Sequence, residues 1–422
     1  MPTESSQNKK ANIWILNHYA ITSNMPGGTR HYDFGKELVK RGYKVTIFAS
    51  SFHYSQHKEL KLNKKEKYKI ENVDGINFIW LKTFPYQKND WRRVVNMISY
   101  MWRVYWLGKK ITKTEKSIKS PEVIIGSSVH LLAVLSAYWL ARYYKSKFIM
   151  EVRDLWPQTL IDMKKFDENS LVIRILKLLE KFLYKKAEII ITLLPLAKEY
   201  ISALGINQKK IVWISNGVDV SKLQEKEKKK GKANDGFKII YIGAHGAANA
   251  IDVILDVAKI LQERQYNKIK FIFVGDGMEK EQLIFRKEKL KLRNVEFYRS
   301  IAKKEIPLTL SQADASIISQ RKMDLYKYGF SYNKLFDFMA VGKPIILAGK
   351  PANNLVVEAK CGISVPPENP EKMAEAIIEL YKMSPGEREK MGRKGRKYVE
   401  KYHSIPLLVD ELEKAIKEVV NE

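Results

Sequence analysis

Short runs rich in isoleucine, valine and phenylalanine recur along the whole chain, and most are followed by a longer amphipathic stretch. The runs lie at 13–16, 45–48, 78–81, 123–125, 148–152, 189–193 and 211–214 in the first half, and at 238–242, 270–274, 295–298, 315–318 and 344–347 in the second. Strands that are apolar on both faces and alternate with helices form a parallel sheet wrapped by helices. The pattern therefore predicts an α/β fold in which ligands bind beyond the carboxyl ends of the strands.

Two separate sheets are predicted, because 422 residues are too many for one ordinary core. The charged segment 221–236 divides the two sets of runs and has no core residue after Leu223, so we interpret it as a linker or surface loop. We expect two doubly wound, Rossmann-like domains over 1–215 and 216–400, with a cleft between them. The remaining stretch, 401–422, is expected to be a helix that packs back on the first domain.

The formal net charge of +28 is compatible with nucleic acid, an anionic membrane surface or phosphorylated substrates. It could also reflect only solvated lysines, which outnumber the arginines and are spread along the chain. No recognisable nucleic-acid-binding motif accompanies the charge, so we expect no nucleic acid partner.

The single cysteine, Cys361, excludes a disulfide framework and a thiolate metal site, and it fits a reducing cytoplasm. The first ten residues lack the apolar stretch of a signal peptide, and no apolar run reaches the roughly 20 residues of a spanning helix. We therefore expect a protein that is not integral to a membrane.

Two glycine-containing loops follow strand candidates and precede helical stretches. Gly27 and Gly28 would let a phosphate approach backbone N–H groups at a helix N-terminus, although such a pair is often only a tight turn. The pattern is not the G-x-G-x-x-G dinucleotide motif, so NAD is not expected. In the second half Gly243 and Gly246 flank His245, which could lie near a diphosphate or be a surface histidine in a close turn.

The most specific segment is SYNKLFDFMAVGKP at 331–344. Ser331 is expected to cap a helix on which Asn333, Lys334 and Asp337 lie near one edge. A carboxylate there can accept hydrogen bonds from two ribose hydroxyls, and a lysine can meet a phosphate or a sugar hydroxyl. The lysine and the aspartate could instead form only a surface ion pair.

Taken together, these motifs resemble the retaining glycosyltransferases of family four, which have the GT-B fold. The resemblance covers nearly the whole chain and is carried by PGGTRHYDFGKELVKRGYKVTIFAS, EVRDLWP, ISNGVD, VGDG and NKLFDFMAVGKP. The first and last of these look closest to the subgroup, sometimes called fucosamine-transferase-like, that builds bacterial surface polysaccharides. The resemblance implies an acceptor-binding domain over 1–215 and a nucleotide-sugar-binding domain over 216–400.

The resemblance also implies donor-binding residues. Gly27 and Gly28 match the donor-phosphate loop, and Asp337 matches the second acid of the paired-acid motif, the one expected on the ribose. The first acid should stand eight positions earlier, where this chain has Gly329. That departure leaves Asn333 or Lys334 as candidate contacts to the donor sugar.

The family's arginine and lysine after the first strand of the second domain are also missing, since GAHGAAN has neither. Arg321 and Lys322, together with Lys334, are therefore candidates to counter the diphosphate charge. The base is expected near Gly275 and near Tyr298 and Arg299, and our hypothesis for it is uracil. Gly243 and His245 complete the predicted donor site.

For the chemistry itself, Arg153 and Asp154 of EVRDLWP end a strand that faces the cleft. His130 lies where the family often has a functional histidine, but it could instead be a buried group that caps a helix. In retaining members the acceptor hydroxyl is thought to attack the front face and the leaving diphosphate to take the proton, so no protein nucleophile is required. We expect no cofactor and no metal, because Asp252 or Asp324 alone would not hold magnesium.

The stretch 90–110 (DWRRVVNMISYMWRVYWLGKK) combines aromatic and basic residues with helical spacing. Such helices lie in the membrane interface, although core packing is the alternative. The residues predicted to meet a membrane or the acceptor are Trp91, Arg92, Arg93, Trp102, Arg103 and Trp106. The stretch 171–186 is more regular, and we interpret it mainly as a core helix. Peripheral attachment to the cytoplasmic face of the plasma membrane would suit the subgroup's acceptor, an undecaprenyl-diphosphate-linked sugar.

The leading hypothesis is transfer of an N-acetylated hexosamine or deoxyhexosamine from a UDP-sugar to a polyprenyl-diphosphate-linked acceptor in capsule or O-antigen synthesis. One alternative is a transferase with a soluble acceptor, as in sucrose-phosphate or glycogen-type synthesis. A UDP-sugar epimerase shares the fold, but no suitable carboxylate and histidine arrangement is present. The last alternative is a non-enzymatic basic protein that binds membrane or nucleic acid.

Overall fold

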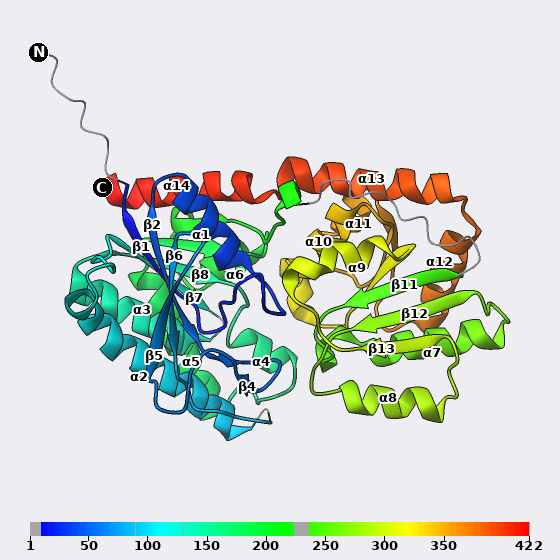
Figure 1. Ribbon diagram of the computed structural model, residues 1–422, viewed down its shortest axis with the longest axis horizontal. Coiled ribbons are helices and arrows are strands. Elements are labelled where there is room, and N and C mark those ends of the chain that lie inside the picture. Colours follow the sequence, from blue (N-terminus) through cyan, green and yellow to red (C-terminus); the bar gives the residue numbers. More distant parts are fainter. Residues whose placement is uncertain (1–9, 89, 129, 223–235, 422) are drawn as a thin grey trace, which may run out of the picture.

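A computed structural model of the chain describes residues 10–88, 90–128, 130–222 and 236–421. Two α/β domains lie side by side, and two consecutive C-terminal helices run along one side of both (Figure 1). Each domain holds a mainly parallel sheet with helices on both faces. The predicted pair of doubly wound domains is therefore confirmed.

The N-terminal sheet has eight strands in the order β10-β9-β8-β7-β1-β2-β6-β5, parallel except for the β5–β6 pair. Its strands are β1 (Asn12–Leu16), β2 (Lys44–Ser50), β5 (Tyr68–Val73), β6 (Ile76–Leu81), β7 (Val123–Ser128), β8 (Lys147–Val152), β9 (Ile189–Thr192) and β10 (Ile211–Trp213); β3 (Phe52–His53) and β4 (Lys58–Glu59) form a separate pair. The helices are α1 (Arg30–Lys40), α2 (Trp91–Thr114), α3 (Leu131–Tyr144), α4 (Gln158–Asp162), α5 (Leu171–Lys186) and α6 (Ala197–Ala203), with short 3₁₀ turns η1 (Gln208–Lys210) and η2 (Val220–Lys222).

The C-terminal sheet has six parallel strands in the order β13-β12-β11-β14-β15-β16. They are β11 (Phe237–Ile242), β12 (Ile269–Val274), β13 (Val295–Tyr298), β14 (Ala315–Ser319), β15 (Ile345–Ala348) and β16 (Gly362–Val365). The helices are α7 (Ile251–Glu263), α8 (Lys280–Lys289), α9 (Ile306–Ser311), α10 (Asn333–Val341), α11 (Leu355–Glu358), α12 (Pro370–Lys382), α13 (Pro385–Tyr402) and α14 (Ile405–Asn421), with 3₁₀ turns η3 (Ala247–Asn249), η4 (Lys303–Glu305) and η5 (Asp324–Tyr328).

Alternate residues of each strand pack on opposite faces of the sheet. Trp14 belongs to the core under α2 and α3, whereas Ile13 belongs to the core under α1 and α14. In the second sheet Ile239 packs towards α7 and α12, and Ile240 packs towards α10. The strand order reverses between β1 and β7 in one sheet and between β11 and β14 in the other. Ligands of such sheets bind beyond the carboxyl ends of the strands at these reversal points.

The C-terminal chain crosses from one domain to the other. Helix α13 packs against α10, and α14 then packs on the N-terminal domain, where Leu408 and Val409 join its core. A second crossing runs through Ser215, whose hydroxyl lies 2.7 Å from His403 Nδ1. Arg30 donates to the carbonyls of Ile214 and Ser215 beside it. The two crossings are thus bonded to each other and to the N-terminal domain.

Helix α5 differs from its sequence-based interpretation as a core helix. Its residues Leu171 and Leu178 are 72% and 71% exposed, and Val172, Ile175 and Phe182 are also exposed. Only Ile173, Glu180, Leu183 and Tyr184 are buried. The helix carries more apolar residues than one packed face can cover, so the prediction was wrong. Within the described residues, no helix combines the length and the apolar character needed to span a bilayer.

Candidate functional site

The glycine loop of the first domain abuts the N-terminal end of α10 in the second. A Cβ atom on Gly28 would overlap the side-chain amide nitrogen of Asn333, so the two segments approach each other closely. Nearby, the backbone N–H groups of Lys303 and Lys304 donate to the carbonyls of Met25 and Ser23, each at 3.2 Å. The two predicted donor-binding segments therefore meet between the domains.

Helix α10 begins one residue later than the sequence predicted. Its N-cap residue is Tyr332, and no side chain caps the helix. The Ser331 hydroxyl instead accepts a 2.8 Å hydrogen bond from the backbone N–H of Asn216. The predicted cap was wrong because Ser331 ties the interdomain crossing to the helix.

The carboxylate of Asp337 is buried between the domains and is held by Lys303. Asp337 is 7% exposed, and Lys303 Nζ lies 2.6 and 2.5 Å from its two oxygens. Burial raises the pKa of Asp337, and the charge of Lys303 opposes that rise. The surface ion pair between Lys334 and Asp337 that the sequence left open is not formed. Lys303 was absent from the sequence-based site because it comes from a different loop.

Lys334 turns towards the glycine loop that follows β11. Its ammonium donates to Tyr241 Oη at 2.9 Å and to Asn249 Oδ1 at 2.6 Å. A Cβ on Gly243 would lie 3.2 Å from the same ammonium. Both partners are neutral, and burial lowers the pKa of Lys334 to about 7. A diphosphate placed against Gly243 would therefore meet a lysine that has no carboxylate among its two hydrogen-bond partners.

His245 is fully buried and is not the surface histidine of the simpler interpretation. Its ring lies 6.0 Å from that of Tyr241 and 5.8 Å from that of Phe297, and its backbone bonds to Asp276 and Glu279. Burial lowers its pKa to about 4, so the ring is neutral at pH 7. The residue packs the two glycine loops of the second domain together.

The loops expected to hold the base are bonded to one another. A Cβ on Gly275 would clash with the carbonyl of Gly243. Lys280 Nζ donates to the carbonyls of Gly275 and Tyr298 at 2.8 and 2.9 Å. The side chains of Tyr298 and Arg299 are exposed beside this junction. Gly275, Tyr298 and Arg299 thus lie close together, as residues that bind one base must.

Arg321 lies beside the glycine loop that follows β11, where its Nε donates to the carbonyl of Ala247. Its charge is already balanced. Its guanidinium forms ion pairs with Asp252 at 2.6 Å and with Glu368 at 3.1 Å. The backbone N–H of Lys322 also donates to Glu368. These contacts weaken the prediction that Arg321 counters a diphosphate and leave Lys334 as the better candidate.

Gly329 stands where the family has an acid, and its surroundings account for the difference. Its φ of +92° is a left-handed conformation that side chains disfavour. A Cβ there would lie 2.6 Å from Asn353 Oδ1 and 2.7 Å from Pro195 Cδ of the opposite domain. The position therefore packs against the first domain and has no room for a carboxylate.

On the N-terminal side, His130 is a buried helix cap. Its Nδ1 accepts from the backbone N–H of Ala133 at 3.2 Å, and its Nε2 lies 2.8 Å from His18 Nδ1. Burial and the charge of Arg93 lower the pKa of His130 to about 3. The neutral tautomer that accepts at Nδ1 donates from Nε2, so His18 carries its proton on Nε2. That nitrogen is buried and has no hydrogen-bond partner among the described residues.

Arg93, which the sequence predicted to meet a membrane or the acceptor, lies near this histidine pair. Its positive charge contributes to the lowered pKa values of His18 and His130. His18 is stacked between Tyr19 and Tyr100, with ring centroids 4.4 and 4.3 Å away. The sequence missed His18 because its role depends on a partner 112 positions away.

Beneath the glycine loop lies a buried network centred on Glu151. Arg30 Nε, His31 Nε2 and Ser127 Oγ lie 2.8, 2.6 and 2.7 Å from its carboxylate oxygens. Burial alone would raise the pKa of Glu151, but the charges of His31 and Arg30 hold it well below its usual range. The network fixes the start of α1 to the end of β8, and Arg30, His31 and Glu151 all stand in the motifs quoted above.

Arg153 and Asp154 follow β8 at the cleft. Asp154 is open to solvent, yet the surrounding protein excludes enough water to raise its pKa. Its charge also contributes to the raised pKa values of Tyr326 and Tyr332 in the other domain. The described residues contain no group of three or more His, Cys, Asp or Glu side chains placed to hold a metal ion.

Comparisons with known proteins identify the family of each domain. Residues 27–217 match the family described as "Glycosyl transferase 4-like domain", and residues 223–398 match "Glycosyl transferases group 1". The chain is therefore a glycosyltransferase with the GT-B fold. Its N-terminal domain belongs to the glycosyl transferase 4-like family, and its C-terminal domain belongs to glycosyl transferases group 1.

Individual relatives are distant. The chain is 25% identical over 256 residues to an uncharacterised glycosyltransferase of Methanocaldococcus jannaschii, and this match spans 58% of the chain but only 62% of that relative. It is 22% identical to the probable glycosyltransferase WbjE of Pseudomonas aeruginosa, over 64% of the chain and 68% of WbjE.

Solved structures share the fold at low identity. Sucrose-phosphate synthase of Thermosynechococcus elongatus superposes with a TM-score of 0.76 at 15% identity, over 98% of this chain and 100% of that one. HepE of Anabaena, solved with UDP and glucose, gives a TM-score of 0.64 at 14% identity, over 96% and 99%.

Proposed function

We propose that the protein is a retaining glycosyltransferase that moves a sugar from a UDP-sugar to a polyprenyl-diphosphate-linked acceptor. The observation that carries the proposal is the placement of Asp337 and Lys334 on one helix, which meets the glycine loop of the opposite domain at Gly28. A site for a nucleotide sugar needs a hydrogen-bond acceptor for the ribose hydroxyls and a positive group for the diphosphate. Asp337 can be the first and Lys334 the second.

In this proposal Asp337 accepts hydrogen bonds from the ribose hydroxyls and Lys334 meets the diphosphate. The base lies along Gly275, Tyr298 and Arg299, and uracil is the base that we infer. The HepE structure with UDP and glucose supports a uridine nucleotide, because that protein shares the fold. The transferred sugar that we infer is an N-acetylated hexosamine or deoxyhexosamine.

The reaction that we infer proceeds by front-face attack. The acceptor oxygen bonds to the anomeric carbon while the bond from that carbon to the β-phosphate oxygen breaks, and the acceptor proton passes to the departing diphosphate. No protein nucleophile and no metal is needed. Lys334 and the backbone N–H groups near Gly28 would stabilise the leaving charge. Arg153 and Asp154 would orient the acceptor.

The acceptor would approach from the N-terminal domain. Arg93 and the Nε2–H of His18 lie together there, and both can donate to an anionic diphosphate. Trp91, Trp102 and Trp106 are exposed along α2, with Arg92 and Arg103 among them. This pattern supports a cytoplasmic protein held peripherally at the inner face of the plasma membrane, in capsule or O-antigen synthesis.

A soluble acceptor is the second candidate, because sucrose-phosphate synthase shares the fold. Incubation with a panel of radiolabelled UDP-sugars, offered membrane lipid extract or sugar phosphates, separates the two. Label that partitions into the organic phase supports the proposal, whereas label only in a water-soluble product supports the alternative. The anomeric configuration of the product, read by NMR, tests retention: an inverted linkage would exclude the front-face route.

A further inference from the structure

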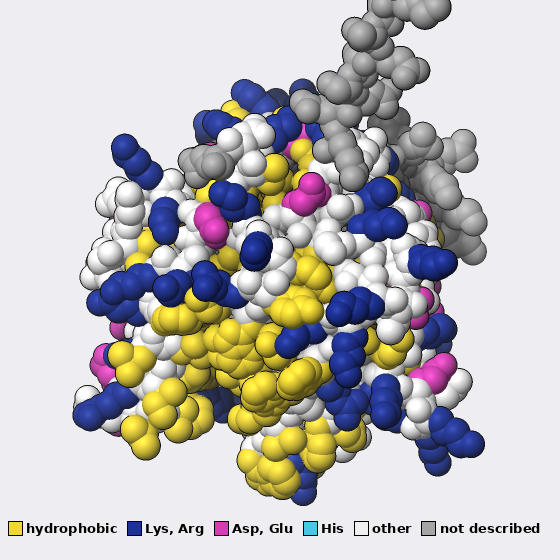
Figure 2. All heavy atoms as spheres, turned by 90° about the vertical axis from the view of Figure 1, so that its left-hand side faces the viewer, with side chains coloured by type: hydrophobic (Ala, Val, Ile, Leu, Met, Phe, Trp, Pro, Cys, Tyr) yellow, Lys and Arg dark blue, Asp and Glu magenta, His cyan; other side chains and the backbone are white. Residues whose placement is uncertain are grey.

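Helices α2, α3 and α5 pack side by side in the N-terminal domain, which is the left-hand domain of Figure 1, and we name their outer surface the three-helix face. Its exposed large apolar side chains are Trp91, Val94, Ile98, Trp102, Trp106, Tyr143, Leu171, Val172, Ile175, Leu178 and Phe182. Figure 2, which views the molecule from the left-hand side of Figure 1, shows a broad apolar area with lysines and arginines around it. An exposed apolar area of this kind marks an interaction surface.

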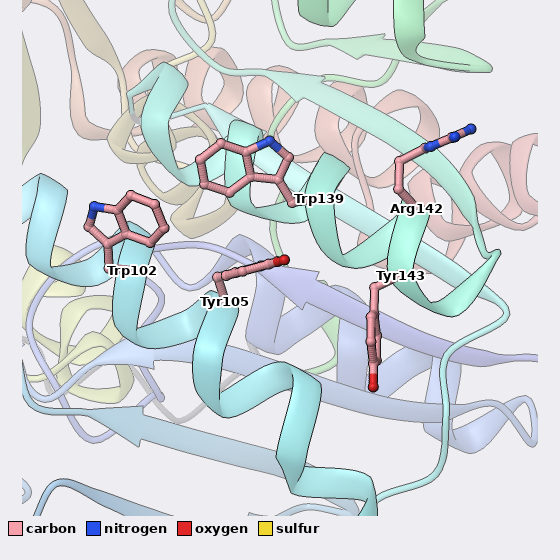
Figure 3. Close-up of a pocket in the computed structure, with 5 residues that line it drawn as sticks. All are labelled: Trp102, Tyr105, Trp139, Arg142 and Tyr143. Carbon is pink, nitrogen blue, oxygen red and sulfur yellow. The ribbon is translucent and has the colours of Figure 1, made fainter.

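A hollow of about 490 Å³ opens on this face between α2 and α3 (Figure 3). It is lined by Trp102, Tyr105, Trp139, Arg142 and Tyr143. The ring of Trp139 lies 5.6 Å from that of Trp102 and 5.5 Å from that of Tyr105. Amphipathic aromatic rings of this type favour the boundary between lipid headgroups and acyl chains.

A second hollow of about 510 Å³ adjoins the first and shares Arg142 with it. Three lysines also line it, namely Lys145, Lys147 and Lys186. Its one acid, Glu188, accepts a 2.9 Å hydrogen bond from the backbone N–H of Phe148. An apolar aromatic hollow thus continues into a basic one. Both lie by the amino end of β8, and the cleft lies beyond its carboxyl end.

The charges around these hollows are almost all positive. Helices α2 and α3 have no acidic residue, and the one acid of α5, Glu180, is buried and bonded to Tyr184 and Tyr200. Two copies of such a face would repel each other. An anionic bilayer has the complementary charge, and its acyl chains accept exposed residues such as Leu171 and Leu178.

We propose that the three-helix face docks on an anionic phospholipid bilayer and that the paired hollows hold one lipid headgroup. The lipid phosphate lies among Arg142, Lys145, Lys147 and Lys186, and its glycerol region lies against Trp139 and Tyr105. Leu171, Leu178 and Trp106 enter the bilayer. The inference rests on the proposed membrane location, and it adds α5 and a headgroup site that is separate from the donor and acceptor cleft.

Vesicle flotation with the full chain tests the proposal. We compare phosphatidylcholine vesicles with vesicles that contain phosphatidylglycerol, and we compare the R142Q/K145Q variant with K394Q/K397Q. The control pair removes the same charge from exposed positions on α13. Each basic residue near anionic lipid contributes about 1 kcal/mol, so the R142Q/K145Q variant should bind about 30-fold more weakly and the control less than twofold.

A second pair of variants tests the apolar contacts. Leu178→Ser and Trp106→Ser change exposed side chains, so each should fold normally and still lose binding to the same vesicles. Wild-type affinity of R142Q/K145Q, or equal loss in the K394Q/K397Q control, would overturn the headgroup site while leaving the proposed function intact. If the wild-type protein forms dimers and binds neither kind of vesicle, that result would overturn the docking surface and the membrane location together. Transfer to a soluble acceptor analogue, measured in parallel, reports the catalytic activity of the cleft independently of membrane binding.

Discussion

Lys303 Nζ lies 2.6 and 2.5 Å from the two carboxylate oxygens of Asp337, although the residues are 34 positions apart and belong to different elements, η4 and α10. The backbone N–H of Lys303 is bonded to Met25 of the opposite domain. Any ligand that engages Asp337 therefore also meets a residue that is bonded across the cleft. Donor binding and the contact between the domains are expected to depend on each other.

The ammonium of Lys334 should take up a proton when a diphosphate binds. Its pKa of about 7 leaves it mostly neutral at pH 8, and a neighbouring anion favours its charged form. Calorimetry of UDP binding at pH 8, in two buffers of different ionisation enthalpy, should report uptake of up to about one proton. In K334M the uptake should vanish and affinity should fall about tenfold, whereas the K394M control, at an exposed position on α13, should behave as wild type. Equal proton uptake in K334M and wild type would refute the assignment.

Restoring the family's acid at position 329 should destabilise the protein. The φ of +92° costs a side chain about 1–2 kcal/mol, and the added Cβ also approaches Pro195. We expect G329A and G329E to lower the free energy of unfolding by at least that amount in denaturant titrations. G386A, at an open helical position, should be neutral or slightly stabilising. A G329E protein of wild-type stability would contradict the steric explanation.

Replacing His130 should alter acid stability more than the pH dependence of catalysis. Its pKa is about 3 in the folded protein and about 6.5 when unfolded, so the unfolded chain binds more protons between these values and stability falls as pH falls. At pH 5 this costs about 2 kcal/mol, which H130N should recover while keeping the helix cap. H130A should also lose the cap, about 1 kcal/mol. A rate profile whose acid limb disappears in H130N would instead make His130 a titrating catalytic group.

The sheets were largely predictable because buried parallel strands are continuous apolar runs. Strand β5 was missed: its sequence, YKIENV, alternates apolar and polar residues at an antiparallel edge, although Asp74 and Gly75 mark a hairpin turn. Helix α5 was misassigned because its residues show helical spacing on more than one face, and spacing does not state which face is covered.

The site was predictable where a motif carries the function and not where tertiary contacts decide it. Asp337 and Lys334 could be named from their helix, but their partners Lys303 and Tyr241 come from η4 and from strand β11. Serine is a residue type that often caps helices, yet the hydroxyl of Ser331 instead accepts a hydrogen bond from the backbone N–H of Asn216 in the interdomain crossing. Such choices depend on the packing of two domains, which local sequence does not encode.

Calorimetric titration of UDP into wild-type protein and into D337A tests the central claim most directly. Wild-type protein should bind UDP specifically, and D337A should lose about 10- to 100-fold in affinity, because hydrogen bonds to a carboxylate contribute about 1.5–3 kcal/mol. D324N, which changes an exposed acid on η5, should bind as wild type does. Unchanged affinity in D337A, or no UDP binding by wild type, would contradict the assignment of this helix to the donor nucleotide.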